Sequence, residues 1–190
     1  MTRVRTLPLV LAAHACTVLA LLVFAAITGL PAGAPLALPG AGGMPLAWAF
    51  NLLAWIIPGL VVAVVAVRLR SGLGPQAGRV AGIALQLLLL SALAFAAQGL
   101  LPLDVENLDG GASRGHALAW MLWNLAFAAS ALLAGLTLPP VRWPSLGLCA
   151  VVAAGLLAPG LFGAGLVERV VLLCWGLWTA ALAWRLPRRH

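Results

Sequence analysis

The sequence predicts an all-α integral membrane bundle of six transmembrane helices, and three observations lead to this fold class. Of the 190 residues, 64% are hydrophobic and only 8% are charged, whereas a soluble domain carries roughly 25% charged residues. The apolar residues gather into long runs, and about 20 such residues are needed to cross a bilayer as a helix. The arginines fall between these runs in a one-sided pattern. Because backbone polar groups in lipid must be bonded within their own segment, each run is expected to be helical.

Six runs qualify as membrane spans, and together they make the chain a single transmembrane domain over 1–190. Segments rich in proline, glycine or arginine separate the spans, most clearly at 31–43, 68–78 and 139–144. The break between the last two spans is expected near Pro159 and Gly160. The predicted spans are approximately 7–30, 46–67, 80–101, 116–137, 146–166 and 168–186.

The first span could be mistaken for a cleaved signal peptide, because Arg3 and Arg5 precede it. Its apolar run of 24 residues, from Leu7 to Leu30, is longer than the roughly 7–15 residues of a signal sequence. We therefore expect it to remain as an uncleaved span.

Charge orients the remaining spans. With the N-terminus in the cytoplasm, nine of the eleven arginines fall in cytoplasmic segments, and only Arg114 and Arg169 fall on the other side. All four acidic residues also fall on that outer side. By the positive-inside rule, this predicts an inner-membrane protein with both termini in the cytoplasm. Losing any one span would invert every later loop and destroy the segregation.

The net charge of +7 does not indicate a nucleic-acid-binding protein. The arginines occur mostly singly or in pairs and form no basic helix face, so no nucleic-acid partner is expected. Membrane lipids are the expected partners, and the small residues along the spans would also allow protein partners within the membrane. The cysteines, Cys16, Cys149 and Cys174, lie inside apolar runs as small fillers, because their odd number and wide spacing make no disulfide framework.

Most of the potential chemistry lies in the connection between the third and fourth spans. This connection concentrates Asp104, Glu106, Asp109 and Arg114, and His116 follows at the start of the fourth span. The Asp109-Gly-Gly sequence predicts a turn, and Ser113 is a candidate N-cap.

Four side chains share one face of the predicted fourth helix. Spacings of three, four and four residues join Ser113, His116, Trp120 and Asn124. Trp123, next to this face, fits either a pocket wall or simple packing.

Asn51 and Gln98 reach a similar depth on the second and third spans. Polar groups in hydrocarbon normally face the bundle interior or a wet cavity. The sequence therefore predicts a polar pocket near the outer helix ends. Its expected ligand-binding residues are Asn51, Gln98, Asp109, Ser113, Trp120 and Asn124, with His116 and Asp104 beside them.

Asp104, Asp109 and His116 are suited to two kinds of chemistry. Together they could ligate a divalent metal such as zinc. Alternatively, His116 could act as a catalytic general base oriented by Asp104. The competing interpretation is an interfacial cluster that only caps the fourth helix. The chain lacks His-Glu-x-x-His and His-x₃-His pairs, so the strongest signal of a metal hydrolase is missing.

The same segment resembles a known family. Pro102-Leu103-Asp104 followed by Asp109-Gly110, Ser113 and His116 is similar to the signature of bacterial multi-pass membrane proteins catalogued as domain of unknown function 998. Phe50-Asn51 with Pro58-Gly59 also resembles that group. The resemblance implies a six-helix inner-membrane fold and a site in this segment, but no activity, because the family has no assigned function.

The function expected from the sequence is binding of a small ligand, ion or lipid headgroup in the outer polar pocket. Two alternatives stay open. One is an interfacial or intramembrane hydrolase that uses His116 with Asp104 or Asp109. The other is a non-catalytic structural subunit of the membrane.

Overall fold

The computed structural model describes residues 6–31, 33–157 and 163–186, and every regular element in these ranges is helical. The second span is continuous but irregular, because α2 (Ala47–Asn51) passes through the π-helical turn η2 (Leu52–Ile56) into α3 (Ile57–Ser71). Short 3-10 turns lie in the connections: η1 (Leu38–Gly40), η3 (Pro75–Ala77) and η4 (Pro139–Val141). The other long helices are α1 (Thr6–Thr28), α4 (Gly78–Leu100), α5 (Gly111–Thr137), α6 (Arg142–Leu157) and α8 (Ala164–Arg185).

Six of these helical stretches are long and apolar enough to cross a membrane, which confirms the predicted fold class. The largest difference in boundaries is at the fourth span, where α5 begins at Gly111 and not near 116. Its N-cap is Gly110, with no side-chain cap, so the prediction that Ser113 caps this helix is wrong. The predicted break at Pro159 and Gly160 lies outside the described residues.

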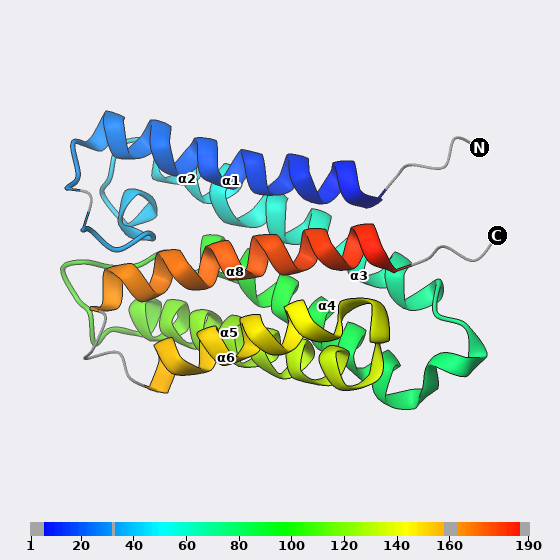
Figure 1. Ribbon diagram of the computed structural model, residues 1–190. Coiled ribbons are helices and arrows are strands. Elements are labelled where there is room, and N and C mark those ends of the chain that lie inside the picture. The colour runs from blue at the N-terminus through cyan, green and yellow to red at the C-terminus, as the bar shows by residue number, and fades with distance from the viewer. Residues whose placement is uncertain (1–5, 32, 158–162, 187–190) are drawn as a thin grey trace.

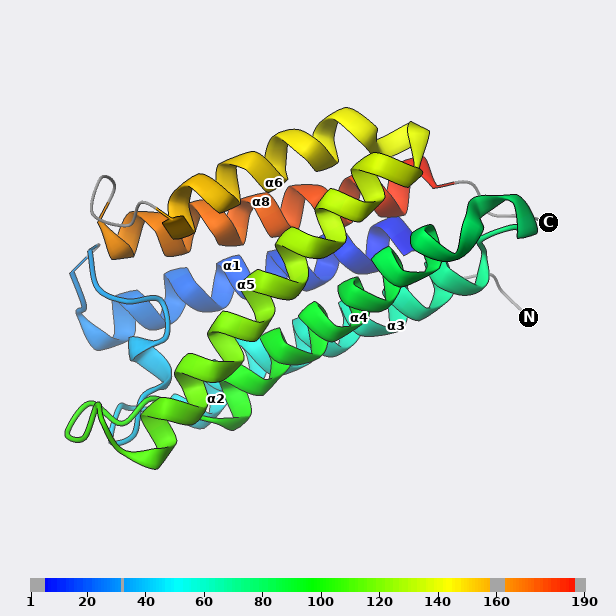
Figure 2. The same ribbon diagram turned by 90° about the horizontal axis from the view of Figure 1, so that it is seen from below.

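The long helices form a closed ring in the order α1, α3, α4, α5, α6 and α8. Each packs against the next one along the chain, and α8 returns to pack against α1 (Figures 1 and 2). The described arginines segregate between the two ends of this bundle. We call one end the arginine end; it holds Arg68, Arg70, Arg79, Arg142 and Arg185. The other is the acidic end, with the segments 29–31, 33–46 and 101–110 and the start of α8.

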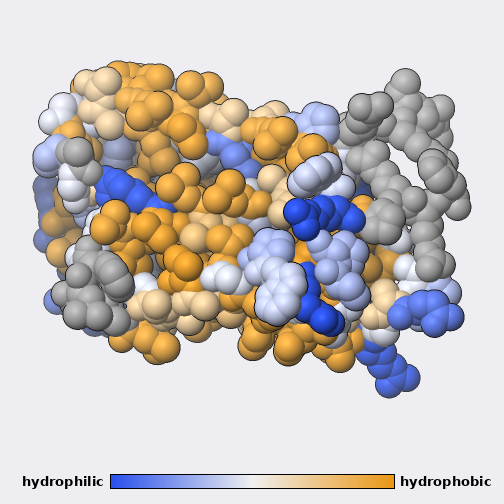
Figure 3. Space-filling model, viewed as in Figure 1, coloured by the Kyte–Doolittle hydropathy of each residue, from blue (hydrophilic) through white to orange (hydrophobic). Residues whose placement is uncertain are grey.

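The surface between the two ends is apolar. Figure 3 shows hydrophobic residues across the face formed by α1, α6 and α8, with hydrophilic residues toward the ends. Leu22, Leu173 and Leu177 are each more than 60% exposed, which would be costly in water and is favourable against lipid. The pattern fits a chain whose solvent is hydrocarbon over most of its length.

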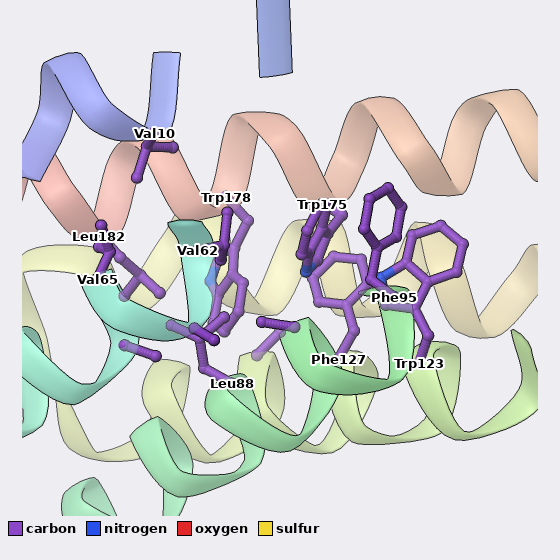
Figure 4. Packing of buried hydrophobic residues seen from close by; sticks show 14 of the residues in the cluster. Val10, Val62, Val65, Leu88, Phe95, Trp123, Phe127, Trp175, Trp178 and Leu182 are labelled. Atoms are coloured by element: carbon purple, nitrogen blue, oxygen red, sulfur yellow. The ribbon is translucent and has the colours of Figure 1, made fainter. Parts of the chain in front are cut away.

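Aromatic rings fill the middle of the bundle. Phe95 of α4 stacks on Trp175 of α8 with ring centroids 4.4 Å apart, and it meets Trp123 of α5 edge-on at 5.1 Å (Figure 4). Trp55 of η2 contacts Phe95 from the other side at 5.0 Å. These rings join the second, third, fourth and last spans into one core.

A glycine sets the distance between the second and third spans. A Cβ atom at Gly59 would lie 2.7 Å from the backbone nitrogen of Ala96 and 2.8 Å from the carbonyl oxygen of Ala92. The two backbones therefore touch at a distance that only glycine permits, as small residues commonly allow in membrane bundles.

Candidate functional site

His116 sits at the acidic end and closes the C-terminus of α4. Its Nδ1 donates to the carbonyl oxygen of Leu101 at 2.9 Å and lies 3.3 Å from the carbonyl oxygen of Gln98. Gln98 lies in the last turn of α4 and Leu101 is its C-cap, and helices leave carbonyls at this end without an internal partner. Because a carbonyl can only accept, Nδ1 carries the proton, and in the neutral tautomer Nε2 would be the acceptor.

Asp104 is occupied by the loop that follows α4. Its Oδ1 accepts from the backbone N–H groups of Glu106 at 3.1 Å and Asn107 at 3.2 Å, which fixes the turn. Ser113 accepts from the Asp104 N–H at 3.1 Å and donates to the Asp104 carbonyl at 2.9 Å. The structure thus gives Asp104 and Ser113 a shared role in holding the loop against α5.

The three predicted metal ligands are not brought together. Asp109 is exposed in the loop, while His116 is buried under it. Within the residues that the structure describes, no three His, Cys, Asp or Glu side chains group closely enough to hold a metal ion. Nor does Asp104 orient His116, because a backbone carbonyl takes the Nδ1 proton. Zinc binding and general-base catalysis stay predictions without support from this geometry.

The predicted polar face of the fourth span is observed. Ser113, His116 and Asn124 are buried and Trp120 is half-buried on α5. The two predicted asparagines differ from each other, however. Asn51 donates from Nδ2 to the Gly40 carbonyl at 2.8 Å and so pins the loop before α2. Asn124 bonds back to Trp120 O of its own helix at 2.8 Å, and its Oδ1 has no partner among the described residues.

A small cavity of about 30 Å³ lies beside His116. Its buried side carries Trp55, Gln98, His116 and Trp123. The other lining residues are half-buried: Leu36, Ala37, Trp120 and Glu168. Since one water needs roughly 10–15 Å³ of such space, the cavity has room for about two waters or one small polar group.

Three residues that line the cavity carry a buried side-chain donor without an acceptor. Trp55 Nε1, Gln98 Nε2 and Trp123 Nε1 are buried and unpaired among the described residues. Each such atom costs about 1–3 kcal/mol if it stays unsatisfied. Buried polar groups are paired in most structures, so three unpaired donors on residues that line one cavity single it out as a candidate binding site.

Trp55 lies in the distorted part of the second span. Pro58 has no N–H to give to the preceding turn. The carbonyls left over there are bonded from α1, by Thr17 Oγ1 to Ala54 O at 3.0 Å and by Cys16 Sγ to Leu53 O at 3.2 Å. Such π turns are frequently found at functional sites.

Gly99 then lets α4 come close to this turn. A Cβ at Gly99 would meet the Asn51 carbonyl and an Ile56 side-chain carbon, each at 2.8 Å. The neighbouring Gln98 is thereby placed on the same cavity as Trp55.

Glu168 reaches the cavity through the strap, the name we give to residues 33–37. Its Oε2 accepts from the backbone N–H of Leu36 at 2.9 Å. The next residue of α8, Arg169, donates from Nη2 to the carbonyl of Ala34 at 2.9 Å. This pair of opposite charges ties the strap to the first turns of α8.

Sequence reasoning missed Glu168 and Trp55 as site residues. Glu168 is an acid beside an apolar span, which is itself a signal for a site. Trp55 lies four residues after Asn51, on the same helical face. Neither signal shows that the strap would fold over the cavity, because that contact joins residues 132 positions apart.

The cavity offers hydrogen bonds of both kinds. Its lining residues Trp55, Trp123 and Gln98 carry N–H donors, while Glu168 carries a carboxylate that accepts, as does Nε2 of His116 in the neutral tautomer. A carboxylate in the wall disfavours an anionic guest. A hydroxyl group or water, which accepts and donates at once, satisfies both sides.

Comparison with protein-family models, with curated proteins and with solved structures finds no match to this chain.

Proposed function

We propose that the chain is an inner-membrane protein that binds a hydroxyl-bearing polar group, from a small molecule or a lipid headgroup, in the cavity at its acidic end. The observation that carries the proposal is the set of three buried, unpaired N–H donors on residues that line that cavity. In a low-dielectric interior, an unpaired donor is costly and a paired one is strong. A guest that accepts hydrogen bonds from these donors is stabilised by the free-energy difference between the unpaired and the paired state.

The arginine distribution supports the orientation of this proposal. By the positive-inside rule, the arginine end faces the cytoplasm, so both termini lie there and the cavity opens on the outer side. The guest would then arrive from the periplasm or from the outer leaflet. Gln98, His116 and Trp120, three of the residues predicted from the sequence, line this cavity.

The geometry favours binding over hydrolysis. In the hydrolase alternative a carboxylate orients His116, whereas here the Leu101 carbonyl holds Nδ1. Asp104 is engaged by its own loop, and Asp109 is exposed. In this arrangement His116 is better suited to accept a hydrogen bond from a guest than to act as an activated general base.

The test follows the indole N–H groups directly. Purified protein labelled with ¹⁵N-tryptophan in detergent is titrated with free glycerol and, separately, with a glycerol-headgroup phospholipid, and the signals are assigned with Trp→Phe variants. The Trp55 and Trp123 signals should move downfield as their protons are accepted. Trp175 is the matched control, because its Nε1 is also buried and unpaired but does not line this cavity. Its signal should stay in place.

The two probes separate the sources of the guest. A response to glycerol alone assigns a small molecule, and a response to the phospholipid alone assigns a headgroup. If neither probe moves Trp55 or Trp123, or if Trp175 moves equally, the binding proposal fails. The cavity would then hold only water, and the structural-subunit alternative would be favoured.

A further inference from the structure

A second hollow, larger and apolar, lies on the lipid-facing side of the strap. Helices α1 and α8 touch near the arginine end, where Thr6 bonds to Ala183 O and His14 to Thr179. They diverge toward the acidic end (Figure 1). A groove of about 450 Å³ opens there, between Leu21, Leu22 and Ala25 of α1 and Leu172 and Leu173 of α8, with the strap at its end.

This groove faces the hydrocarbon of the membrane. Leu22 is 64% exposed and Leu173 is 62% exposed, so the groove's rim belongs to the lipid-facing surface. Water would find no hydrogen-bond partners in an apolar hollow at this depth. If the hollow stayed empty, the residues that line it would lose dispersion contacts. A hydrocarbon chain is the occupant that restores those contacts.

A positive charge stands at the membrane-surface end of the groove. Arg169 lines it and is held in place through Ala34 O on the strap and Gly165 O on α8. Its neighbour Glu168 lines the polar cavity instead. Two successive residues of α8 thus line two different hollows: Glu168 lines the polar cavity and Arg169 lines the apolar groove.

We propose that this groove binds one phospholipid of the adjacent leaflet, with an acyl chain between α1 and α8 and its phosphate at Arg169. A guanidinium near the membrane surface attracts a phosphate, and its planar set of N–H groups matches phosphate oxygens. The splayed helices supply the apolar length below it. The inference does not depend on the guest of the polar cavity.

The experiment uses native mass spectrometry of the detergent-purified full chain. The protein is titrated with a single lipid, palmitoyl-oleoyl phosphatidylglycerol. Ala25→Trp fills the groove and should lower the fraction of protein carrying one lipid by at least fivefold. Ala26→Trp is the matched control, because Ala26 is exposed on the same helix and outside the groove. It should bind like the wild type.

The charge is tested separately, in case the tryptophan variant folds poorly. Arg169→Gln keeps N–H donors for the strap and removes the charge, so lipid affinity should fall about fivefold. Arg169→Lys should retain most of it. A diacylglycerol with the same chains, which lacks phosphate, should bind more weakly than the phospholipid.

Three results would overturn the proposal. In the first, Ala25→Trp binds as much lipid as Ala26→Trp, which means that the lipid sits elsewhere. In the second, both tryptophan variants lose lipid equally, as expected of a non-specific annulus. In the third, Arg169→Gln and the diacylglycerol show no loss of affinity, which removes the phosphate contact.

Discussion

Two buried tryptophan environments differ within a single bundle. In the arginine-side half, Trp178 of α8 donates from Nε1 to Ser145 Oγ of α6 at 2.9 Å. In the half toward the acidic end, Trp55 and Trp123 are as deeply buried, yet their indole N–H groups have no partner among the described residues. The indole N–H thus has an acceptor within the chain at Trp178 and none among the described residues at Trp55 and Trp123.

The buried hydroxyls away from the cavity differ from the donors of the lining residues, although Trp175 Nε1 is also unpaired and lies outside the cavity. Away from the cavity, buried hydroxyls are paired with backbone on neighbouring helices, such as Ser130 with Ala84 O and Ser91 with Trp123 O. Such bonds join helices at modest net energy. Around the cavity, three lining residues carry donors without a partner among the described residues, so their energy depends on whether a guest pairs with them.

The largest expected effect concerns the close packing of the bundle's middle. Gly59→Ala should lower the free energy of unfolding by about 2 kcal/mol, since the new Cβ would press on the backbone of α4. Thermal unfolding in detergent, followed by circular dichroism, measures the loss.

Gly147→Ala provides the matched control for this prediction. A Cβ at Gly147 on α6 would meet nothing within 4 Å. The change should be neutral or should raise stability by up to ~1 kcal/mol through helix propensity. Equal losses at Gly59 and Gly147 would contradict the close contact between α3 and α4.

The next effect concerns the paired tryptophan. Ser145→Ala should cost about 1–2 kcal/mol, because Trp178 Nε1 would become a buried donor without an acceptor. Adding Trp178→Phe to this variant should cost less than the sum of the single changes, as measured by a double-mutant cycle. Additive losses would mean that the indole–hydroxyl bond contributes nothing.

A smaller effect separates the two ring nitrogens of His116. His116→Ala should destabilise by about 1 kcal/mol, since the last carbonyls of α4 lose their donor. His116→Asn places an amide nitrogen at the position of Nδ1 and should restore most of this stability. It should still weaken the response of the cavity to its guest, because the Nε2 acceptor is gone. If His116→Asn restores both the stability and the response to the guest, the only role of His116 is to cap the C-terminus of α4.

The smallest effect is expected where a polar side chain is removed from the cavity itself. Gln98→Leu should change stability by less than about 0.5 kcal/mol or raise it, because the Nε2 donor is already unpaired. Asn51→Leu is the comparison, since it breaks the bond to Gly40 O and should cost about 1 kcal/mol. A larger loss at Gln98 than at Asn51, in chemical unfolding of the lipid-free protein, would mean that Gln98 is already satisfied.

The amino-acid sequence alone determined the six helical spans and the two chemically different ends of the bundle. Hydrocarbon imposes this, because it forces each apolar run to bond its own backbone and each arginine to lie at an end. Helical periodicity also placed Ser113, His116 and Asn124 on one buried face. These are local rules, and they hold without knowledge of which helix packs on which.

The tertiary structure alone decided which polar groups meet. Asp104 and His116 are close in sequence, yet each is satisfied by nearby backbone, while Glu168 and Trp55 from distant spans line the same cavity as Gln98. Composition and spacing carry no record of the strap folding onto α8, or of Gly99 letting α4 approach the turn at Pro58. Those contacts depend on how helices pack, and packing is a property of the whole bundle rather than of any one span.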